Sequence, residues 1–375
     1  MAIIGGGIVG ASMAARLAAA GAAVRLYERE AIGAAASGRN SGVVQHPFDP
    51  VLAALHLETV ELYRELERSA PDRFTLPPTP AGLLAVGHDA VSVQRLAAAL
   101  AETHPALEPR YLAPGEASRV EPALAASVAA CRLSIGYPVG PAAATRAWAA
   151  WARDLGARLE LGRAARPWSR GGRIAGIELA GERVAAGGVV VAAGPWSPGL
   201  VDPSGAWRPI RPVWGVVVDI ELAMPPRHVL EQADIDIEPA PVSDEAAARV
   251  GERDFSLVPS GAVSALGSTF LPDEPDRDAL VPDLVAHGTR FVPGIATGRL
   301  GAARACARPQ SFDGRPLLGR IPGIDGLWVA AGHGPWGIST GPASGRLVAD
   351  LVLGRITGPP PELDPARFGR LPAIG

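Results

Sequence analysis

Three glycines near the first residue have the spacing that a phosphate-binding turn requires. Gly5, Gly7 and Gly10 form the pattern G-x-G-x-x-G, with Ile8 and Val9 between the last two. Such glycines permit a tight turn, let backbone N–H groups approach a pyrophosphate, and allow a helix to pack closely on a strand. We therefore predict that this turn holds a dinucleotide at the positive end of the following helix. A glycine-rich turn without a ligand is the alternative.

The segments around this turn fit a dinucleotide-binding unit. An apolar run at residues 2–4 precedes the glycines, a helix is expected over residues 8–20, and a second strand over residues 23–28. That strand ends at Glu28, whose carboxylate can accept hydrogen bonds from ribose hydroxyls, and Arg29 follows as a further candidate contact. The order strand, turn, helix, strand predicts an α/β fold.

A short polar segment after the second strand is another candidate contact for the dinucleotide. Residues 37–42 are small, polar and flanked by glycine, as a loop that runs along a ligand would be. The candidate contacts in this segment are Ser37, Arg39, Asn40, Ser41 and Gly42. An ordinary surface loop is the alternative.

Two later segments repeat the pattern of a buried strand that enters a glycine-containing turn. The first covers residues 188–194, and Ala193, Gly194 and Trp196 are its candidate contacts. The second covers residues 327–332 and precedes a helix expected over residues 341–353. N–H groups ahead of that helix could stabilise negative charge on a ligand. The candidate contacts there are Gly332, His333, Gly334, Trp336, Gly337 and Ile338.

The rest of the chain mixes helical and strand patterns. Helices are expected over residues 51–70, 92–102 and 145–155, because apolar side chains recur there at helical spacing. Alternating runs between residues 211 and 270 indicate an antiparallel sheet with loops. These patterns predict a second structural unit beside the dinucleotide-binding one.

Composition and charge exclude several classes of function. With a formal net charge of -3 over 375 residues and no basic stripe, the chain offers no electrostatic case for binding nucleic acid. The two cysteines, Cys131 and Cys306, are too few for a disulfide framework, and the histidines lack metal-ligand spacing, so we predict no metal. No apolar stretch is long enough to span a bilayer, and no targeting signal is evident. We therefore expect a cytoplasmic protein with no integral membrane segment.

In their order along the chain, these landmarks resemble those of the D-amino-acid oxidase superfamily, which includes glycine oxidase, monomeric sarcosine oxidase and D-amino-acid dehydrogenases. The segments that carry the resemblance are residues 5–28, 37–42, 192–196, 308–309 with 313–316, and 332–337. The resemblance implies FAD as cofactor. It also implies an α/β Rossmann-like FAD-binding domain, interleaved with an α+β, mostly antiparallel, substrate domain.

The resemblance also suggests how the chain divides between the two domains. The expected FAD-binding domain is discontinuous and comprises residues 1–76, 135–205 and 295–375. The expected substrate domain comprises residues 77–134 and 206–294.

Arg308 is the candidate substrate-binding residue that the resemblance implies. In glycine oxidase-like chains, the Arg of an Arg-Pro before an Asp-Gly-x-Pro turn holds the substrate carboxylate, and a planar guanidinium suits that bidentate task. A structural arginine paired with an acidic residue is the alternative. Glycine oxidase-like chains often carry a second arginine near the last glycine motif, where this chain has Pro335 and Trp336. That difference argues against a very small substrate, and Trp336 with Trp214 could form an apolar wall.

Cys306 falls where sarcosine oxidase-like enzymes carry the cysteine that bonds to the flavin. A covalent link through Cys306 is therefore a possibility, although a small buried thiol with non-covalent FAD is the commoner arrangement. Those enzymes also use a lysine in the reaction with oxygen, and this chain has no lysine. Reaction with oxygen would need another positive group, such as His333, His46 or an arginine. The alternative is a dehydrogenase that passes electrons to a quinone or another carrier.

The expected reaction is oxidative deamination of an amino acid or N-substituted amino acid. Hydride transfer from the α-carbon to flavin N5 would give an imine that hydrolyses to an oxo acid. The nearest alternative is oxidation of a 2-hydroxy acid, as in L-2-hydroxyglutarate oxidase, for which His46 would be the base. The other alternative is a non-catalytic flavin protein that transfers electrons.

Overall fold

The short apolar run before the glycine motif forms a central strand of a six-stranded sheet. A computed structural model describes residues 1–233 and 253–369. The strand order is β18-β19-β12-β1-β2-β8, and all neighbours are parallel except β18 and β19. The strands are β1 (Ala2–Ile4), β2 (Arg25–Glu28), β8 (Arg158–Leu161), β12 (Val189–Val191), β18 (Leu317–Arg320) and β19 (Leu327–Ala331).

Different elements cover the two faces of this sheet. Alternate residues of a strand point to opposite faces, so Ile3 packs with helices on one side, whereas Ala2 and Ile4 pack with strand β10 on the other. The helices are α1 (Ile8–Ala19), α3 (Pro50–Ser69), α6 (Pro141–Asp154) and α9 (Gly337–Val352). Opposite them lies a three-stranded antiparallel sheet of β9 (Ala165–Arg170), β10 (Arg173–Leu179) and β11 (Glu182–Ala185).

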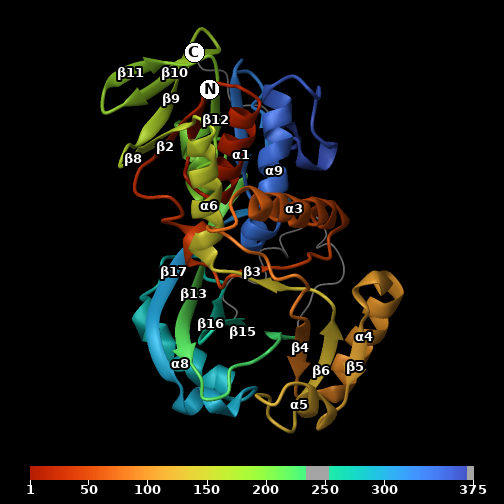
Figure 1. Cartoon of the computed structure of the whole chain (residues 1–375). Coiled ribbons are helices and arrows are strands. Elements are labelled where there is room, and N and C mark those ends of the chain that lie inside the picture. Colours follow the sequence, from red (N-terminus) through yellow and green to blue (C-terminus); the bar gives the residue numbers. More distant parts are fainter. Residues whose placement is uncertain (234–252, 370–375) are drawn as a thin grey trace.

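An eight-stranded, mostly antiparallel sheet occupies the other end of the elongated molecule (Figure 1). Its order is β17-β13-β16-β15-β14-β4-β6-β5, and only β14 and β4 are parallel neighbours. Its strands are β4 (Leu83–Gly87), β5 (Arg110–Leu112), β6 (Ala129–Leu133), β13 (Ile210–Glu221), β14 (Val229–Gln232), β15 (Arg253–Ser260), β16 (Val263–Thr269) and β17 (Arg299–Ser311). Helices α5 (Glu116–Val120) and α8 (Arg277–Thr289) pack on the face of this sheet that carries Leu84, whereas α4 (Ala90–Thr103) packs on the opposite face, which carries Leu83.

Shorter elements connect these layers. Strands β3 (Val43–Val44) and β7 (Tyr137–Pro138) pair with each other between the two sheets. The remaining elements of the described residues are α2 (Ala36–Arg39) and α7 (Ser197–Val201), with the 3-10 helices η1 (Pro105–Leu107), η2 (Gly194–Trp196), η4 (Pro293–Thr297), η5 (Gly334–Trp336), η6 (Pro361–Leu363) and η7 (Pro365–Phe368).

The fold class expected from the sequence is confirmed: a Rossmann-like parallel sheet stands beside an antiparallel sheet. The strands between residues 158 and 185 were not predicted. Strand β17 lies in the range expected for the FAD-binding domain, but it pairs along its length with β13 of the eight-stranded sheet. We therefore propose that this domain boundary lies near Ser311 rather than at residue 295. Parts of the predicted ranges, residues 234–252 and 370–375, lie outside the described residues.

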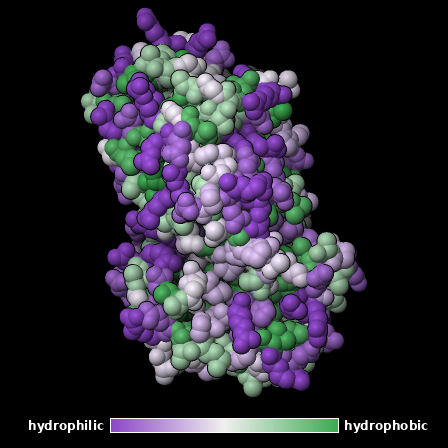
Figure 2. Space-filling view, in the orientation of Figure 1, coloured by the Kyte–Doolittle hydropathy of each residue, from purple (hydrophilic) through white to green (hydrophobic). Residues whose placement is uncertain are grey.

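The surface in Figure 2 mixes hydrophilic and hydrophobic residues over the whole face shown. Among residues 1–233 and 253–369, no helix combines the length and the apolar character needed to cross a bilayer.

Candidate active site

A cavity of about 1050 Å³ has walls from both large sheets. On the parallel side it is lined at the carboxyl ends of strands, by the last residues of β1, β2 and β19, which are Ile4, Glu28 and Ala331. On the antiparallel side it is lined by β13 to β17, including Arg308. Ligands of open parallel sheets bind outside the carboxyl ends of the strands. The cavity thus joins a nucleotide-binding edge to a second chamber.

The glycine motif makes the turn between β1 and α1 very tight. Gly5 has a φ of 117°, and a Cβ atom there would lie 2.3 Å from the carbonyl oxygen of Ala192. A Cβ at Gly10 would lie 2.1 Å from the carbonyl oxygen of Gly5. Gly5, Gly7, Ile8 and Val9 line the cavity, whereas Gly10 does not. The absence of a side chain at Gly10 allows the helix to pack closely on the turn.

Glu28 is held in place by two backbone N–H groups. Its Oε2 atom accepts a hydrogen bond from Gly6 N at 2.7 Å, and its Oε1 atom accepts one from Glu30 N at 2.9 Å. Beside it, the Arg29 guanidinium lies 3.9 Å from the centroid of the Trp196 ring, a cation–π contact. All three predicted residues, Glu28, Arg29 and Trp196, line this end of the cavity.

The polar segment after β2 curves along the cavity wall. Ser37 Oγ accepts a hydrogen bond from Ile8 N at 3.0 Å, so the segment also caps the start of α1. Asn40 Oδ1 accepts a hydrogen bond from Gly42 N at 2.8 Å and fixes the turn that follows. The predicted residues of this segment that line the cavity are Ser37, Arg39, Asn40 and Ser41.

Gly42, the last residue of the predicted segment, does not line the cavity. It has a φ of 85°, and a Cβ there would lie 2.4 Å from the carbonyl oxygen of Val139. Gly42 is needed for the turn and for close backbone approach, rather than for contact with a ligand.

Arg308 extends from β17 into the chamber on the antiparallel side. Its Nη1 atom donates a hydrogen bond to the carbonyl oxygen of Thr269 at 2.7 Å, and its guanidinium carbon lies 4.4 Å from the centroid of the Phe270 ring. Burial lowers the pKa of Arg308, and the nearby Cys306 and Asp254 oppose that shift. Because arginine stays protonated in proteins, Arg308 is a positive charge that faces the cavity.

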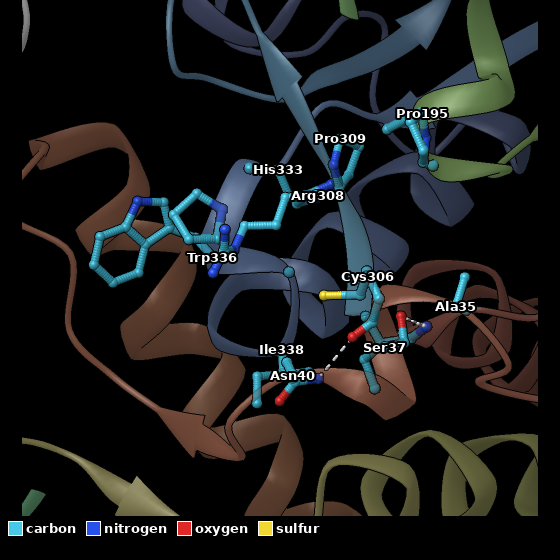
Figure 3. Close-up of a pocket in the computed structure, with 18 of the residues that line it drawn as sticks. Ala35, Ser37, Asn40, Pro195, Cys306, Arg308, Pro309, His333, Trp336 and Ile338 are labelled. Carbon is cyan, nitrogen blue, oxygen red and sulfur yellow. Dashed lines mark hydrogen bonds between the residues drawn. The ribbon is translucent and has the colours of Figure 1, made fainter. Parts of the chain in front are cut away.

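Cys306, Arg308 and Gln310 occupy alternate positions on β17, and all three line the cavity. Figure 3 shows Arg308 extending from this strand toward the segment of His333 and Trp336, and β17 bridges to that segment through Gln310 and His333. Burial raises the pKa of the Cys306 thiol, so the thiol is protonated at neutral pH.

His333 is buried and uncharged. Its Nε2 atom lies 2.9 Å from Ser344 Oγ, which itself donates to the carbonyl oxygen of Thr340. Because the hydroxyl hydrogen is used in that way, we assign the ring hydrogen to Nε2 of His333. Burial lowers the pKa of His333 to about 4. The ring is thus neutral at pH 7.

The rest of the last glycine turn surrounds the same part of the cavity. Gly334, Trp336, Gly337 and Ile338 line it together with His333. Gly332 does not line it: Gly332 has a φ of 95°, and a Cβ there would lie 3.1 Å from Leu317 Cδ1.

His46, a candidate acid or base from the sequence, is not among the residues that line the cavity. Its neighbours Gln45 and Pro47 line the cavity, so the side chain between them points to the opposite side of this extended segment. There the His46 ring lies 5.2 Å from the ring of His56, and burial lowers the pKa of His46. His46 is therefore not placed to act as an acid or base in the cavity.

Several polar side chains of the cavity were not predicted. Glu231 on β14, with Asp254 and Ser256 on β15, lines the chamber that also holds Arg308. Glu231 Oε2 accepts a hydrogen bond from Gln45 Nε2 at 2.8 Å. In the sequence, Asp254 and Ser256 alternate with Phe255 and Leu257, which are buried. This alternation could have indicated that Asp254 and Ser256 share one face of a strand.

Comparison with known proteins identifies the family. Residues 1–351 match the family described as DAO, FAD dependent oxidoreductase. The chain belongs to this family. Glycine oxidase of Pseudomonas aeruginosa is 29% identical to it over 381 residues, covering 98% of both chains. The expected family is thus confirmed.

Solved structures agree with this family. The crystal structure of glycine oxidase from Geobacillus kaustophilus is 26% identical, with a TM-score of 0.80 over 100% of this chain and 98% of that one. L-proline dehydrogenase from P. horikoshii is 23% identical, with a TM-score of 0.81 over 99% of this chain and 98% of that one, and so shares the fold.

The residues present fit the cofactor of the family. The turn at Gly5 has no room for a side chain, the first residues of α1 line the cavity, and Glu28 lies at the end of β2. The protein belongs to a family of FAD-dependent oxidoreductases, and these residues are the ones that would hold the pyrophosphate and ribose of FAD.

Proposed function

We propose that this FAD-dependent oxidoreductase oxidises the α-carbon to nitrogen bond of an amino acid. The observation that carries the proposal is Arg308, a positive charge in the chamber next to the glycine turn of His333 and Trp336. The relative named glycine oxidase, similar over 98% of both chains, supports the same class of reaction. The product would be an imine, which water hydrolyses to an oxo acid. FAD, when bound, supplies the two-electron oxidation.

In this proposal Arg308 binds the substrate carboxylate and orients the α-carbon. A guanidinium can form two parallel hydrogen bonds to a carboxylate, which fixes the plane and the rotation of the substrate. Phe270 and Trp336 line the chamber and reduce contact with water. Trp336 also presents an apolar ring to the chamber, which favours a substrate with an apolar side chain over glycine, which has none.

An amine is favoured over a 2-hydroxy acid by the charges in the chamber. Asp254 lies close enough to Arg308 to counteract the lowering of the arginine pKa, and both residues line the cavity. A pair of opposite charges complements the carboxylate and the ammonium group of an amino acid zwitterion. A 2-hydroxy acid has no cation for Asp254, and His46, its expected base, lies outside the cavity.

We propose that FAD is bound without a covalent link and that oxygen or a quinone-type carrier accepts the electrons. The protonated state of the Cys306 thiol supports the first point. For the second point, reaction with oxygen needs a positive group near the flavin. The pKa values of His333 and His46 are both lowered, so we assign this positive charge to Arg308, which lines the chamber. The cytoplasm is our proposed location, supported by the free thiols of Cys131 and Cys306.

The test is anaerobic bleaching of the flavin band near ~450 nm. D- and L-amino acids, N-methyl amino acids and 2-hydroxy acids would be compared, and air would then be readmitted to separate an oxidase from a dehydrogenase. We expect bleaching by one amino acid class. Bleaching by hydroxy acids alone would assign the alternative reaction, and a flavin that no donor reduces would favour an electron-transfer protein.

A variant test targets the carboxylate site directly. Arg308→Leu should raise KM for the active amino acid by about tenfold or more, since a hydrogen bond to a charged group contributes ~1.5–3 kcal/mol. Arg299→Leu, which changes an exposed arginine of the same strand, is the matched control. An unchanged KM in Arg308→Leu would remove Arg308 from this role.

A further inference from the structure

Gly215 lies under the guanidinium of Arg308. Strand β13 presents Val213, Gly215 and Val217 to the cavity at alternate positions, and Gly215 pairs with Cys306 on the neighbouring strand. Arg308 is two residues beyond Cys306 and faces the same cavity. The guanidinium therefore crosses from β17 to the surface of β13.

A side chain at position 215 would occupy the space of the guanidinium itself. An ideal Cβ on Gly215 would lie 2.3 Å from Nη2, 2.4 Å from Cζ and 2.5 Å from Nη1 of Arg308. The three distances are nearly equal, so the overlap is with the charged end of the side chain and not with its aliphatic stem. The position of Arg308 in this structure is thus compatible only with glycine at residue 215.

The backbone gives no other reason for glycine here. The φ angle of Gly215 is outside the left-handed region that favours glycine. Glycine weakens the interior of a strand because it packs no side chain, whereas valine is favoured there, as at positions 213 and 217. The space that Gly215 leaves is filled by Arg308.

Two further groups hold Arg308 over that space. The Thr269 carbonyl accepts a hydrogen bond from Nη1 at 2.7 Å, and the Phe270 ring lies 4.4 Å from Cζ. If the guanidinium were displaced from Gly215, it would have to lengthen one or both contacts. Its direction toward a substrate would change with them.

We propose that Gly215 is a positioning residue that sets the location of the Arg308 guanidinium for binding of the substrate carboxylate. This inference rests on the proposed function, in which Arg308 holds the carboxylate. Gly215 touches no reacting atom in this scheme and acts through Arg308 alone.

The inference predicts loss of carboxylate affinity with little loss of stability. The three atoms nearest to the new Cβ of Gly215→Ala belong to the flexible end of one side chain, so that side chain can move while the strands stay paired. We expect the Kd of propionate, followed by the change in flavin absorbance, to rise about tenfold to a hundredfold. KM for the active amino acid should rise more than kcat falls, and FAD content and Tm should stay near the wild-type values.

A double-mutant cycle separates this role from a purely structural one. In the Arg308→Leu background the guanidinium is gone, so Gly215→Ala should change the Kd of propionate less than about twofold. Gly294→Ala is the matched control, because Gly294 is exposed and its Cβ would meet no atom within 4 Å. An equal loss of affinity in both backgrounds, or wild-type affinity in Gly215→Ala, would overturn the proposal.

Whether Gly215→Ala and the double variant fold also tests the proposal. If Gly215→Ala fails to fold but the double variant folds, the overlap with Arg308 is the cause and the proposal stands. If both fail to fold, Gly215 serves the sheet itself and the proposal is wrong. A failure of the proposed function is recognised separately, because no amino acid would then bleach the wild-type flavin.

Discussion

Gln45 Nε2 lies 2.8 Å from Glu231 Oε2, so a hydrogen bond inside the cavity joins the segment after β3 to strand β14 of the eight-stranded sheet. Gln45 is also tied to the other side, because its backbone N–H donates to Ser339 Oγ of helix α9 at 2.9 Å. Gln45 thus links the helix that follows the last glycine turn to the sheet that carries Arg308.

Loss of this link should lower the stability of the protein. Hydrogen bonds to charged groups contribute about 1.5–3 kcal/mol, so Gln45→Leu should lower the free energy of unfolding by that order and Tm by a few degrees. Thermal unfolding of Gln45→Leu, Glu231→Leu and the double variant measures it. Strictly additive losses would show that the two side chains do not stabilise each other.

The Asp254→Asn substitution should have opposite effects on the binding of simple carboxylates and on the turnover of amino acids. The substitution removes a negative charge close to Arg308 and so makes the chamber more attractive to an anion. The Kd of propionate should therefore fall by a few-fold. The amino acid loses a partner for its ammonium group, so its kcat/KM should fall about tenfold. Asp278→Asn, at an exposed residue of α8, is the control. Parallel changes for both ligands would contradict the role of Asp254.

The flavin should leave the protein on denaturation. Burial keeps the Cys306 thiol protonated, and a thiol is a far weaker nucleophile than a thiolate. Acid precipitation of the yellow protein should therefore release FAD into the supernatant, and Cys306→Ala should still carry FAD. Flavin that stays with the precipitate in the wild type, but not in Cys306→Ala, would establish the covalent alternative.

Mild acid should destabilise the protein through His333. Its pKa is about 4 in the folded state against 6.5 for an ordinary histidine, so between these values the unfolded chain binds a proton that the folded protein does not. Stability should be fully present above pH ~6.5 and fall as the pH drops toward ~4, by about 3 kcal/mol for this group.

Tm measured against pH tests this expectation. His333→Gln, which keeps a polar atom near Ser344, should lose less stability over that window than the wild type. His88→Gln, at an exposed histidine, should follow the wild-type curve. Equal pH dependence in all three proteins would contradict the assignment to His333.

The nucleotide end of the site was predictable because its signals are local. The turn from Gly5 to Gly10 and the carboxylate of Glu28 are separated by few residues, and steric limits on the turn leave a direct trace in the sequence. The family resemblance added the more distant segments, including Arg308.

The substrate end was less predictable because it depends on pairing between distant strands. The place of Arg308 is set by Gly215, Thr269 and Phe270, which lie far from it in sequence. His46 illustrates a second difficulty. In an extended segment, a shift of one residue decides which side chains point to the cavity, and here Gln45 points to it instead of His46. Without the register of the sheet, neither relationship could be read from residue types.

The alternation of side chains along β17 makes this strand sensitive to chain length as well as to residue type. Cys306, Arg308 and Gln310 face the cavity because each is two residues from the next. An inserted residue ahead of Cys306 would bring Ala305, Ala307 and Pro309 into their places and remove the thiol, the guanidinium and the amide from the cavity face in one event. Variant libraries that aim at other amino acid substrates must therefore preserve the length of the strand as well as Arg308.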